Sequence, residues 1–231
     1  MSDITSIDLL KFESQLPEEQ GDIKYANKSK VFNIGLPKVF QQFFAFLMLV
    51  ILSPIFILVA IIIKYESPGG VIFSQIRVGI KGRRFKFYKF RSMRTPQDPN
   101  YVDISELKSD RDGVCAKLFD DPRITRVGRF IRKYSIDELP QLLNVLKGDM
   151  VLIGPRPALV QECDQYAMKA RERLDVSPGL TGLWQVSGRA DTTFNEQIDL
   201  DLKYIRERSC LEDIRILLAT IPVVLFGKGA Y

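Results

Sequence analysis

One apolar run dominates the hydropathy pattern of the chain. Residues 43–63 read FFAFLMLVILSPIFILVAIII, and Ser53 is the only polar side chain among them. At about 1.5 Å per helical residue the run would be roughly 31 Å long, close to the hydrocarbon thickness of a bilayer. A buried helix of a soluble core is the alternative, but a helix that is apolar on every face leaves too little of the chain to cover it. The pattern therefore predicts a membrane helix.

A Ser-Pro pair divides this run. Pro54 removes one helical hydrogen bond and pushes the backbone away from the carbonyl of Val50, and the Ser53 hydroxyl can bond a freed carbonyl. Lysines and arginines flank the run on both sides, whereas a true span leaves positive charge mainly on the cytoplasmic side. A helix that enters the membrane, breaks at Ser53-Pro54 and returns to the same face satisfies both observations. Proline kinks also occur in ordinary spans, so the residues alone leave both forms open.

The rest of the chain alternates short strand-like and helix-like segments. Residues 71–78 (VIFSQIRV) and 84–91 (RFKFYKFR) are typical of strands, and the glycines between them predict a hairpin turn. Helical spacing recurs over residues 125–133, 139–146 and 160–174. Residues 211–226 are apolar but short and are interrupted by Arg215 and Pro222, so they predict a helix that lies on the bilayer surface.

These elements predict an α/β fold, rich in helix and with a β-hairpin, in a membrane-anchored protein with a kinked helix and interfacial helices. We expect an acidic N-terminal tail over residues 1–30 and the kinked membrane helix over residues 31–66. Residues 67–231 then form the main body of the protein, which ends in the interfacial helix. The first 23 residues contain six acidic side chains and one lysine, although the chain as a whole carries a net charge of +5.

The composition excludes several kinds of chemistry. The chain has no histidine, which rules out a Ser-His-Asp or Cys-His nucleophile, a histidine base and a histidine-ligated metal. Its three cysteines are far apart in the sequence and indicate neither a zinc cluster nor a disulfide framework. Catalysis must therefore use carboxylates, lysine, arginine, hydroxyl groups or a metal held by oxygen.

Adjacent carboxylates mark the candidate chemical site. Asp137 and Glu138 lie between a basic stretch and Pro140, and proline is tolerated only in the first turn of a helix, so a helix should begin close to Asp137. There the helix dipole favours an ionised acid and attracts phosphate. Ser135-x-x-Glu138 also fits a capping box, which requires no chemistry, although Pro140 would then fall where an N–H is needed.

Six basic residues are candidates for binding an anionic substrate. Arg156 and Arg189 lie in turns, and the prolines on both sides of Arg156 restrict its backbone. The forked guanidinium group suits phosphate oxygens, although any one of these residues taken alone would more often be a solvated surface residue. The full set of candidate substrate-binding residues is Arg77, Lys89, Arg91, Arg132, Arg156 and Arg189.

With these motifs in order, the chain resembles the bacterial sugar transferase family of monotopic phosphoglycosyl transferases, over about residues 34–231. The landmarks are Ser53-Pro54, Phe73-x-Gln75, Tyr88-Lys89-Phe90-Arg91, Asp121-Pro122-Arg123, Asp137-Glu138-Leu139-Pro140-Gln141, Gly154-Pro155-Arg156-Pro157, Pro178-Gly179-x-Thr181-Gly182 and Trp184-Gln185-Val186. Many ordered matches of this kind are far more specific than any single motif.

The resemblance implies transfer of a sugar-1-phosphate from a UDP-sugar to undecaprenyl phosphate, with release of UMP, as the first membrane step of exopolysaccharide or O-antigen synthesis. By position, it implies that Asp137 is the nucleophile, that Glu138 is its partner at a Mg²⁺ ion, and that Ser53-Pro54 breaks a re-entrant helix. It also implies a monotopic protein whose re-entrant helix covers residues 31–66. The catalytic domain, residues 67–231, would then lie at the cytoplasmic face of the bacterial inner membrane, in contact with membrane lipid. We favour a hexose as the sugar, expect no nucleic-acid partner and leave homodimerisation open.

Two other functions remain to be weighed. A basic membrane-surface module could bind anionic lipid or nucleic acid through residues 84–91, but it would give Asp137-Glu138 no role. A glycosyltransferase that releases UDP often uses an Asp-x-Asp metal motif, and Asp199-x-Asp201 has that spacing. We interpret this pair as a solvated helix face. The nucleotide released, UMP or UDP, distinguishes the two enzymes.

Overall fold

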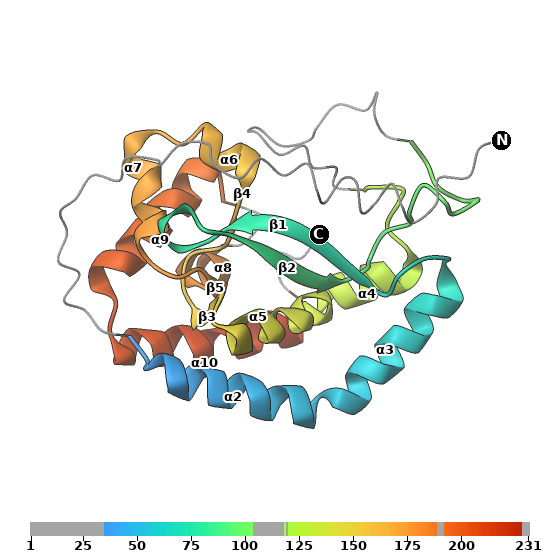
Figure 1. Ribbon diagram of the computed structural model, residues 1–231, viewed down its shortest axis with the longest axis horizontal. Coiled ribbons are helices and arrows are strands. Elements are labelled where there is room, and N and C mark those ends of the chain that lie inside the picture. Colours follow the sequence, from blue (N-terminus) through green and yellow to red (C-terminus); the bar gives the residue numbers. More distant parts are fainter. Residues whose placement is uncertain (1–34, 104–117, 119, 189–191, 228–231) are drawn as a thin grey trace.

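The computed structural model describes residues 35–103, 118, 120–188 and 192–227. The acidic tail predicted for residues 1–30 lies outside this range, as do Arg189 and residues 228–231. The predicted mixture of helices and small sheets is confirmed (Figure 1).

The apolar run forms two helices that meet at a sharp bend. Helix α2 (Lys38–Ile51) and helix α3 (Ser53–Glu66) are bent by 60° at Leu52. As expected from the sequence, the Ser53 hydroxyl donates to the Val50 carbonyl, at 2.8 Å, and Pro54 lies in the first turn of α3. Within the described part of the chain, no single helix has both the length and the apolar character to cross a membrane, whereas α2 and α3 meet that criterion only as a bent pair.

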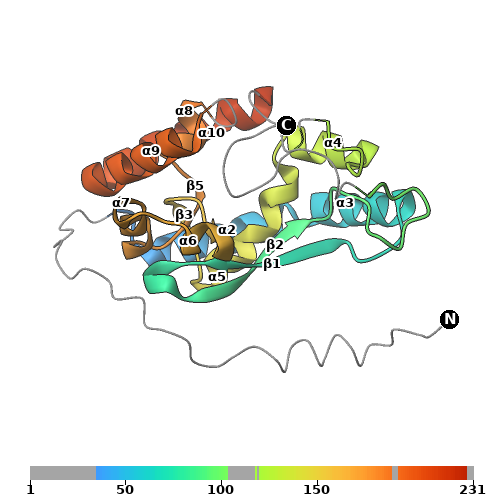
Figure 2. The same ribbon diagram turned by 90° about the horizontal axis from the view of Figure 1, so that it is seen from above.

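The predicted hairpin is present and provides two of the three strands of a sheet. Strands β1 (Ile72–Val78) and β2 (Arg84–Phe90) pair antiparallel around the short 3-10 helix η1 (Ile80–Gly82). Strand β4 (Ala158–Leu159) pairs with the other edge of β1, which gives the order β2-β1-β4. A second sheet consists of the parallel strands β3 (Val151–Ile153) and β5 (Gly179–Thr181). The hairpin and the two last helices lie on opposite sides of the molecule (Figure 2).

Most of the remaining elements are short helices. They are α4 (Arg126–Lys133), the 3-10 helix η2 (Ile136–Gln141), α5 (Leu142–Lys147), α6 (Val160–Asp164), α7 (Met168–Arg171), the 3-10 helix η3 (Glu172–Asp175), α8 (Leu183–Ser187), α9 (Phe194–Glu207) and α10 (Cys210–Phe226). The helices predicted near residues 125–133 and 211–226 are confirmed, and Thr125 caps the first by accepting from the Gly128 N–H.

Two helix predictions need correction. The segment 139–146 is divided between η2 and α5, because Pro140 lies where an uninterrupted α-helix would need an N–H. The segment 160–174 is not one helix but three short ones. Its apolar spacing continues throughout, but the first helix ends at Asp164, and the extended backbone of Ala167 (φ −61°, ψ 160°) separates it from the second.

Buried polar contacts attach the start of α2 to the body. Gln41 is 1% exposed; its amide nitrogen donates to the Leu36 carbonyl at 2.6 Å, and its amide oxygen accepts from the Leu152 N–H of β3 at 2.7 Å. The fully buried carboxylate of Asp213 accepts from the Leu36 N–H at 2.7 Å and lies 2.7 Å from the Tyr204 hydroxyl. The chain entering α2 is therefore tied to β3, α9 and α10.

Polar contacts also attach the far end of α3. The Glu66 carboxylate accepts from the backbone N–H groups of Arg126 and Val127, at 2.7 Å and 3.0 Å, and so occupies the N-terminus of α4. Arg91, at the end of β2, donates to the carbonyls of Ser67 and Pro68. Carboxylates are favourable at a helix N-terminus and guanidinium groups at a C-terminus, so both contacts stabilise this junction.

The buried amide of Gln41 should contribute measurably to stability. We expect Gln41→Leu to lower the free energy of unfolding by about 1–3 kcal/mol, because the Leu36 carbonyl and the Leu152 N–H lose their partner in a buried setting. Gln42→Leu is a matched control, since its bond to the Leu146 carbonyl is exposed. Thermal unfolding in detergent or lipid nanodiscs measures both variants, and equal transition temperatures would contradict the expected difference.

Candidate active site

The two adjacent carboxylates lie on the short helix η2, between α4 and α5. Helix η2 begins at Ile136, one residue before Asp137, which agrees with the start that Pro140 indicated. The capping-box alternative is wrong, because Ser135 has left-handed backbone (φ 54°) and its side chain does not cap the helix. Asp137 and Glu138 are therefore available for other contacts.

Lys89 of β2 connects the hairpin to both carboxylates. Its ammonium nitrogen lies 2.6 Å from Oε1 of Glu138 and 3.8 Å from Oδ2 of Asp137. The position of Lys89 depends on Asn144 of α5, which is fully buried and bonds the free edge of β2: its oxygen accepts from the Tyr88 N–H, and its nitrogen donates to the Lys86 carbonyl. This pair of bonds fixes η2 and α5 beside the strand that carries the lysine.

Burial dominates the electrostatics of Asp137. The residue is 7% exposed, and burial raises the pKa of its carboxyl to about 6. Lys89 opposes this rise, the neighbouring Glu138 adds to it, and Arg132 and Arg156 oppose it as well. The sequence argument relied on a helix N-terminus to keep Asp137 ionised. In the structure η2 is only six residues long, and the surrounding cations have that role.

Arg156 is held in place through its own backbone loop. Arg77 of β1 donates to the Pro157 carbonyl at 3.2 Å, and Arg173 of η3 makes a longer bond, 3.4 Å, to the Arg156 carbonyl. The N–H of Gly179 donates to the Pro155 carbonyl at 2.8 Å. The Arg156 guanidinium lies over the ring of Trp184, 5.8 Å from its centroid. Every residue from 155 to 157 therefore has a backbone carbonyl bonded to another element.

Arg173 is itself part of a buried ion pair. Its guanidinium lies 2.7 Å from Oδ2 of Asp201, and it donates to the Tyr166 hydroxyl at 2.7 Å. Asp201 is 0% exposed, and burial raises its pKa to about 6 against the opposing effect of Arg173. The interpretation of Asp199-x-Asp201 as a solvated face is wrong for Asp201. Residues two apart on a helix face different directions, and Asp199 is exposed, 2.6 Å from Lys169.

The structure brings together five of the predicted site residues: Lys89, Arg132, Asp137, Glu138 and Arg156. Arg77 is buried behind them and bonds the Arg156 loop. Arg91, also predicted to bind substrate, is instead directed to the end of α3, and its burial lowers its pKa. Arg189 lies outside the described residues. Trp184 is 7% exposed and packs under Arg156, so it offers no open face for a base.

The donor set suits one kind of metal site. Among the described residues, no three His, Cys, Asp or Glu side chains lie close enough together to bind one metal ion. These residues therefore form no metal site made of protein ligands alone. Mg²⁺ is typically held by one or two carboxylates together with substrate phosphates and water. Asp137 and Glu138 fit that arrangement, with Lys89 as a competing cation on Glu138.

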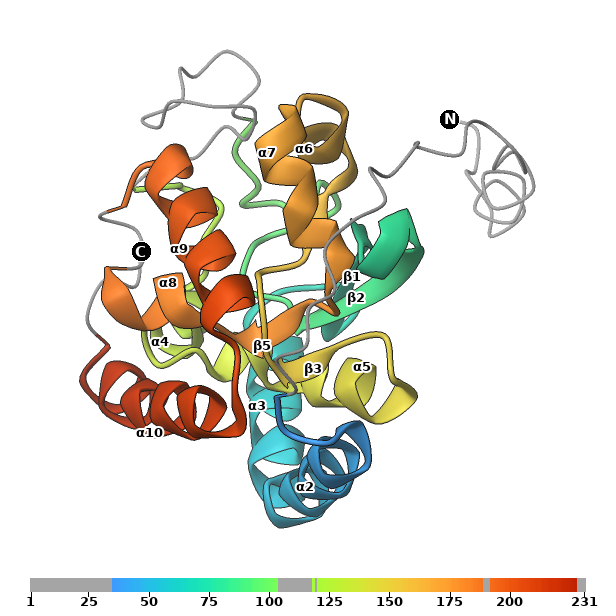
Figure 3. The ribbon, with the colours of Figure 1, turned by 90° about the vertical axis from the view of Figure 1, so that its left-hand side faces the viewer.

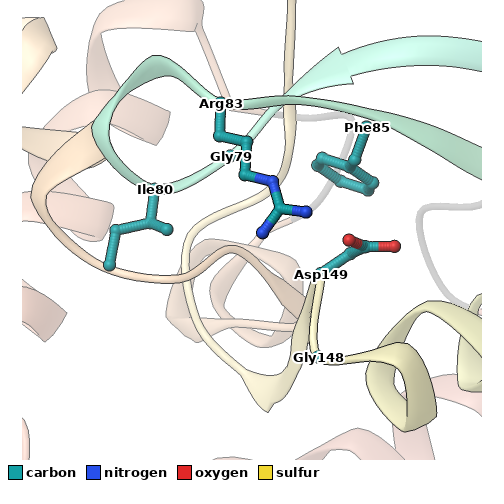
Figure 4. A pocket seen from close by; sticks show the side chains of 6 residues that line it. All are labelled: Gly79, Ile80, Arg83, Phe85, Gly148 and Asp149. Carbon is teal, nitrogen blue, oxygen red and sulfur yellow. The ribbon is translucent and has the colours of Figure 1, made fainter.

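Two hollows lie at or near these elements. One, of about 260 Å³, adjoins Glu138 and is bounded by η2, β5, α8 and α10. The other holds only about 20 Å³ and lies between the hairpin turn and the end of α5, where the Arg83 guanidinium points toward the Asp149 carboxylate (Figure 4). A space of that size suits a water molecule at most, and none of the residues lining it belongs to the cluster around Asp137.

A match to a known family covers most of the chain. The sequence profile described as "Bacterial sugar transferase" matches residues 32–227. The chain belongs to the bacterial sugar transferase family. The matched segment includes the bent helix pair α2 and α3, the hairpin and the carboxylate pair of this sugar transferase.

Named relatives differ in how much of their length the chain covers. The chain is 52% identical to the galactosyl transferase CpsE of Streptococcus agalactiae over 71% of its own length but 37% of that protein. It is 42% identical to the undecaprenyl-phosphate galactose phosphotransferase of Salmonella typhimurium, over 85% of the chain and 42% of that protein. With the exopolysaccharide production protein ExoY of Sinorhizobium fredii it shares 38% identity over 94% of both chains.

The sequence analysis did not predict the Arg173–Asp201 pair, although the position of Asp201 on its helix indicated a buried partner. Asp201 shares a helical spacing with Ile198, Leu202 and Ile205, which are all buried. A charge on the apolar face of a helix indicates a buried partner, because an unpaired charge there would be costly.

Breaking this pair should be far more damaging than changing its exposed neighbour. We expect Asp201→Asn to reduce the free energy of unfolding by about 3–5 kcal/mol, because Arg173 would remain buried and uncompensated. Asp199→Asn should change it by less than about 0.5 kcal/mol, since that pair is exposed. Denaturant titration of both variants tests this expectation, and a loss in Asp201→Asn no larger than that in Asp199→Asn would refute it.

Proposed function

We propose that this sugar transferase is an undecaprenyl-phosphate sugar-1-phosphate transferase that works through a covalent aspartyl-phosphosugar and releases UMP. The observation that carries the proposal is the buried Asp137, next to Glu138 and surrounded by Lys89, Arg132 and Arg156. A carboxylate that attacks a phosphoryl group approaches an anion, so the reaction needs nearby positive charge. The relatives named as undecaprenyl-phosphate galactose and UDP-glucose:undecaprenyl-phosphate glucose-1-phosphate transferases support the substrate class.

In the first step an oxygen of Asp137 attacks the phosphorus that carries the sugar. The new bond joins that oxygen to phosphorus, the bond from phosphorus to the bridging oxygen breaks, and UMP leaves with the bridging oxygen. No base is needed, because a carboxylate has no proton to lose when ionised. Arg132 and Arg156 would offset the charge that develops on the phosphoryl oxygens, and Lys89 would hold Glu138 beside the nucleophile.

In the second step the lipid phosphate attacks the same phosphorus. An oxygen of the acceptor forms the new diphosphate bond, the bond to Asp137 breaks, and the carboxylate is regenerated. The acceptor phosphate is already an anion, so this step also needs no imidazole, in a chain without histidine. Asp137 and Glu138 would hold Mg²⁺, and the ion would supply further compensation of the phosphate charge when bound.

A membrane position for this site is part of the proposal. Large apolar side chains are exposed along α2, α3 and α10, including Phe43, Ile57 and Leu218, each more than half exposed. These three helices lie along one side of the molecule (Figures 1 and 3). Contiguous exposed apolar surface of this extent indicates a membrane or partner contact. The 60° bend favours a re-entrant helix that enters and leaves at the cytoplasmic face of the bacterial inner membrane.

The geometry weighs against the two other functions. The carboxylates of Asp199 and Asp201 point to different surroundings, one exposed and one buried against Arg173, so they do not form a shared metal site for a UDP-releasing glycosyltransferase. A module that only bound anions would gain nothing from a buried carboxylate among its cations, because like charges repel. We therefore favour transfer of a hexose phosphate in exopolysaccharide or related glycan synthesis.

Removing the carboxylate charge should abolish the first step. We expect Asp137→Asn to lower Mg²⁺-dependent release of UMP from UDP-glucose or UDP-galactose by at least about 10³-fold, as for other catalytic nucleophiles. The measurement is nucleotide release in the presence of undecaprenyl phosphate, with a thermal unfolding curve to show that the variant folds. Asp199→Asn is the control and should retain full activity. Undiminished UMP release by Asp137→Asn, or release of UDP by the wild type, would reject the mechanism.

A further inference from the structure

An apolar pocket opens directly beside the carboxylate pair. Its volume is about 260 Å³, and Glu138 is the member of the pair that lines it. Most of the remaining lining is aliphatic and comes from five elements, η2, β3, β5, α8 and α10. The principal aliphatic residues are Ile136, Leu139, Leu180, Leu217, Val223 and Val224.

Several polar side chains in the pocket already have hydrogen-bond partners within the protein. The hydroxyls of Thr181 and Thr220 lie 2.9 Å apart, and Thr220 also donates to the Ile216 carbonyl at 2.8 Å. The Gln185 amide nitrogen donates to the Leu180 carbonyl at 3.2 Å. A sugar or base would need several matched donors and acceptors in such a site. The lining therefore favours an apolar occupant, although the unpartnered oxygen of Gln185 could also accept from a base N–H.

Helix α10 presents two apolar faces, and one of them forms a wall of the pocket. Leu217 and Val224 face the pocket, whereas Leu218 and Leu225 are 60% and 64% exposed on the outer surface. The outer surface of α10 is therefore apolar, like the exposed sides of α2 and α3. An apolar molecule that resides in a bilayer would meet similar surroundings on both sides of α10.

The positively charged residues lie beside the pocket, around the carboxylate pair to which its lining residue Glu138 belongs. Lys89, Arg132 and Arg156 surround the carboxylate pair, whereas the aliphatic lining carries no charge beyond Glu138. A ligand that matches both regions has an anionic head and an apolar tail attached directly to it.

We propose that this pocket receives the isoprene units next to the phosphate of the lipid acceptor, while the phosphate lies among the cations. This inference rests on the proposed function, because it takes a polyprenyl phosphate to be the second substrate. It goes further by placing the isoprene units nearest the phosphate in a pocket of the protein and not in the surrounding bilayer. Each methylene buried there contributes about 0.8 kcal/mol, so a few methylenes suffice for a large effect on acceptor binding.

Filling the pocket provides the test. We expect Val224→Trp to raise the KM for undecaprenyl phosphate at least about tenfold and to leave the KM for the UDP-sugar unchanged. Leu225→Trp is the matched control: it places the same bulk on the outer face of the same helix and should leave both constants unchanged. Thermal unfolding shows whether each variant folds.

A second measurement needs no variant. The wild type is assayed with a synthetic acceptor in which short ethylene-glycol units replace the isoprene units next to the phosphate, while the distal chain is kept for membrane insertion. We expect a similar rise in KM for this acceptor, because polar oxygens would then lie against an aliphatic lining.

The outcomes are separable. A rise in the KM for the UDP-sugar alone in Val224→Trp would assign the pocket to the nucleoside and overturn the inference. Unchanged KM values in Val224→Trp, or equal KM values for the two acceptors, would also overturn it. Failure of the wild type to transfer from any UDP-sugar would instead refute the proposed function, and this inference with it.

Discussion

A buried carboxylate beside a second carboxylate is unfavourable unless cations compensate for it, and much of the molecule serves that requirement. Burial raises the pKa of Asp137, and Lys89, Arg132 and Arg156 oppose the rise. Each cation comes from a different part of the chain, so the sheet, α4 and the loop before β4 must meet at η2. The bonds from Asn144 to the edge of β2 and from Arg77 to the Arg156 loop hold two of these parts in register.

Support for the site extends to a second layer of charges. Arg173 contacts the backbone of the Arg156 loop on one side and Asp201 on the other. A buried ion pair of this kind contributes little net stability compared with apolar packing, but it fixes geometry, because neither partner can move without leaving the other uncompensated. We interpret the pair as a device that holds Arg156 in position, at the cost of burying two charges.

Sequence reasoning recovered the features that depend on local rules. The bend at Ser53-Pro54, the hairpin and the start of η2 follow from proline geometry and from strand or helix periodicity, and the structure has all three. The features it missed depend on contacts between distant residues. Arg91 follows a basic strand and was therefore expected to be exposed. No residue close to it in the sequence indicates that its partners are the carbonyls at the end of α3. Asp201 was interpreted as solvated because it lies in a charge-rich helical stretch, and only its spacing from Ile198 and Ile205 indicated burial. The dominance of burial in the pKa of Asp137 likewise depends on packing that no motif records.

The bent helix pair is fastened to the body at both of its ends, by Gln41 and Asp213 at one end and by Glu66 and Arg91 at the other. Because the pair is attached at two points, it cannot rotate relative to the body as a helix attached at one end could. The distance of Asp137 and Glu138 from the bend at Leu52 is thereby fixed by the lengths of α2 and α3 and by the 60° angle between them. Under the proposed function, that distance would determine how deep in the bilayer the site meets the lipid phosphate, and side chains far from Asp137 would set this depth.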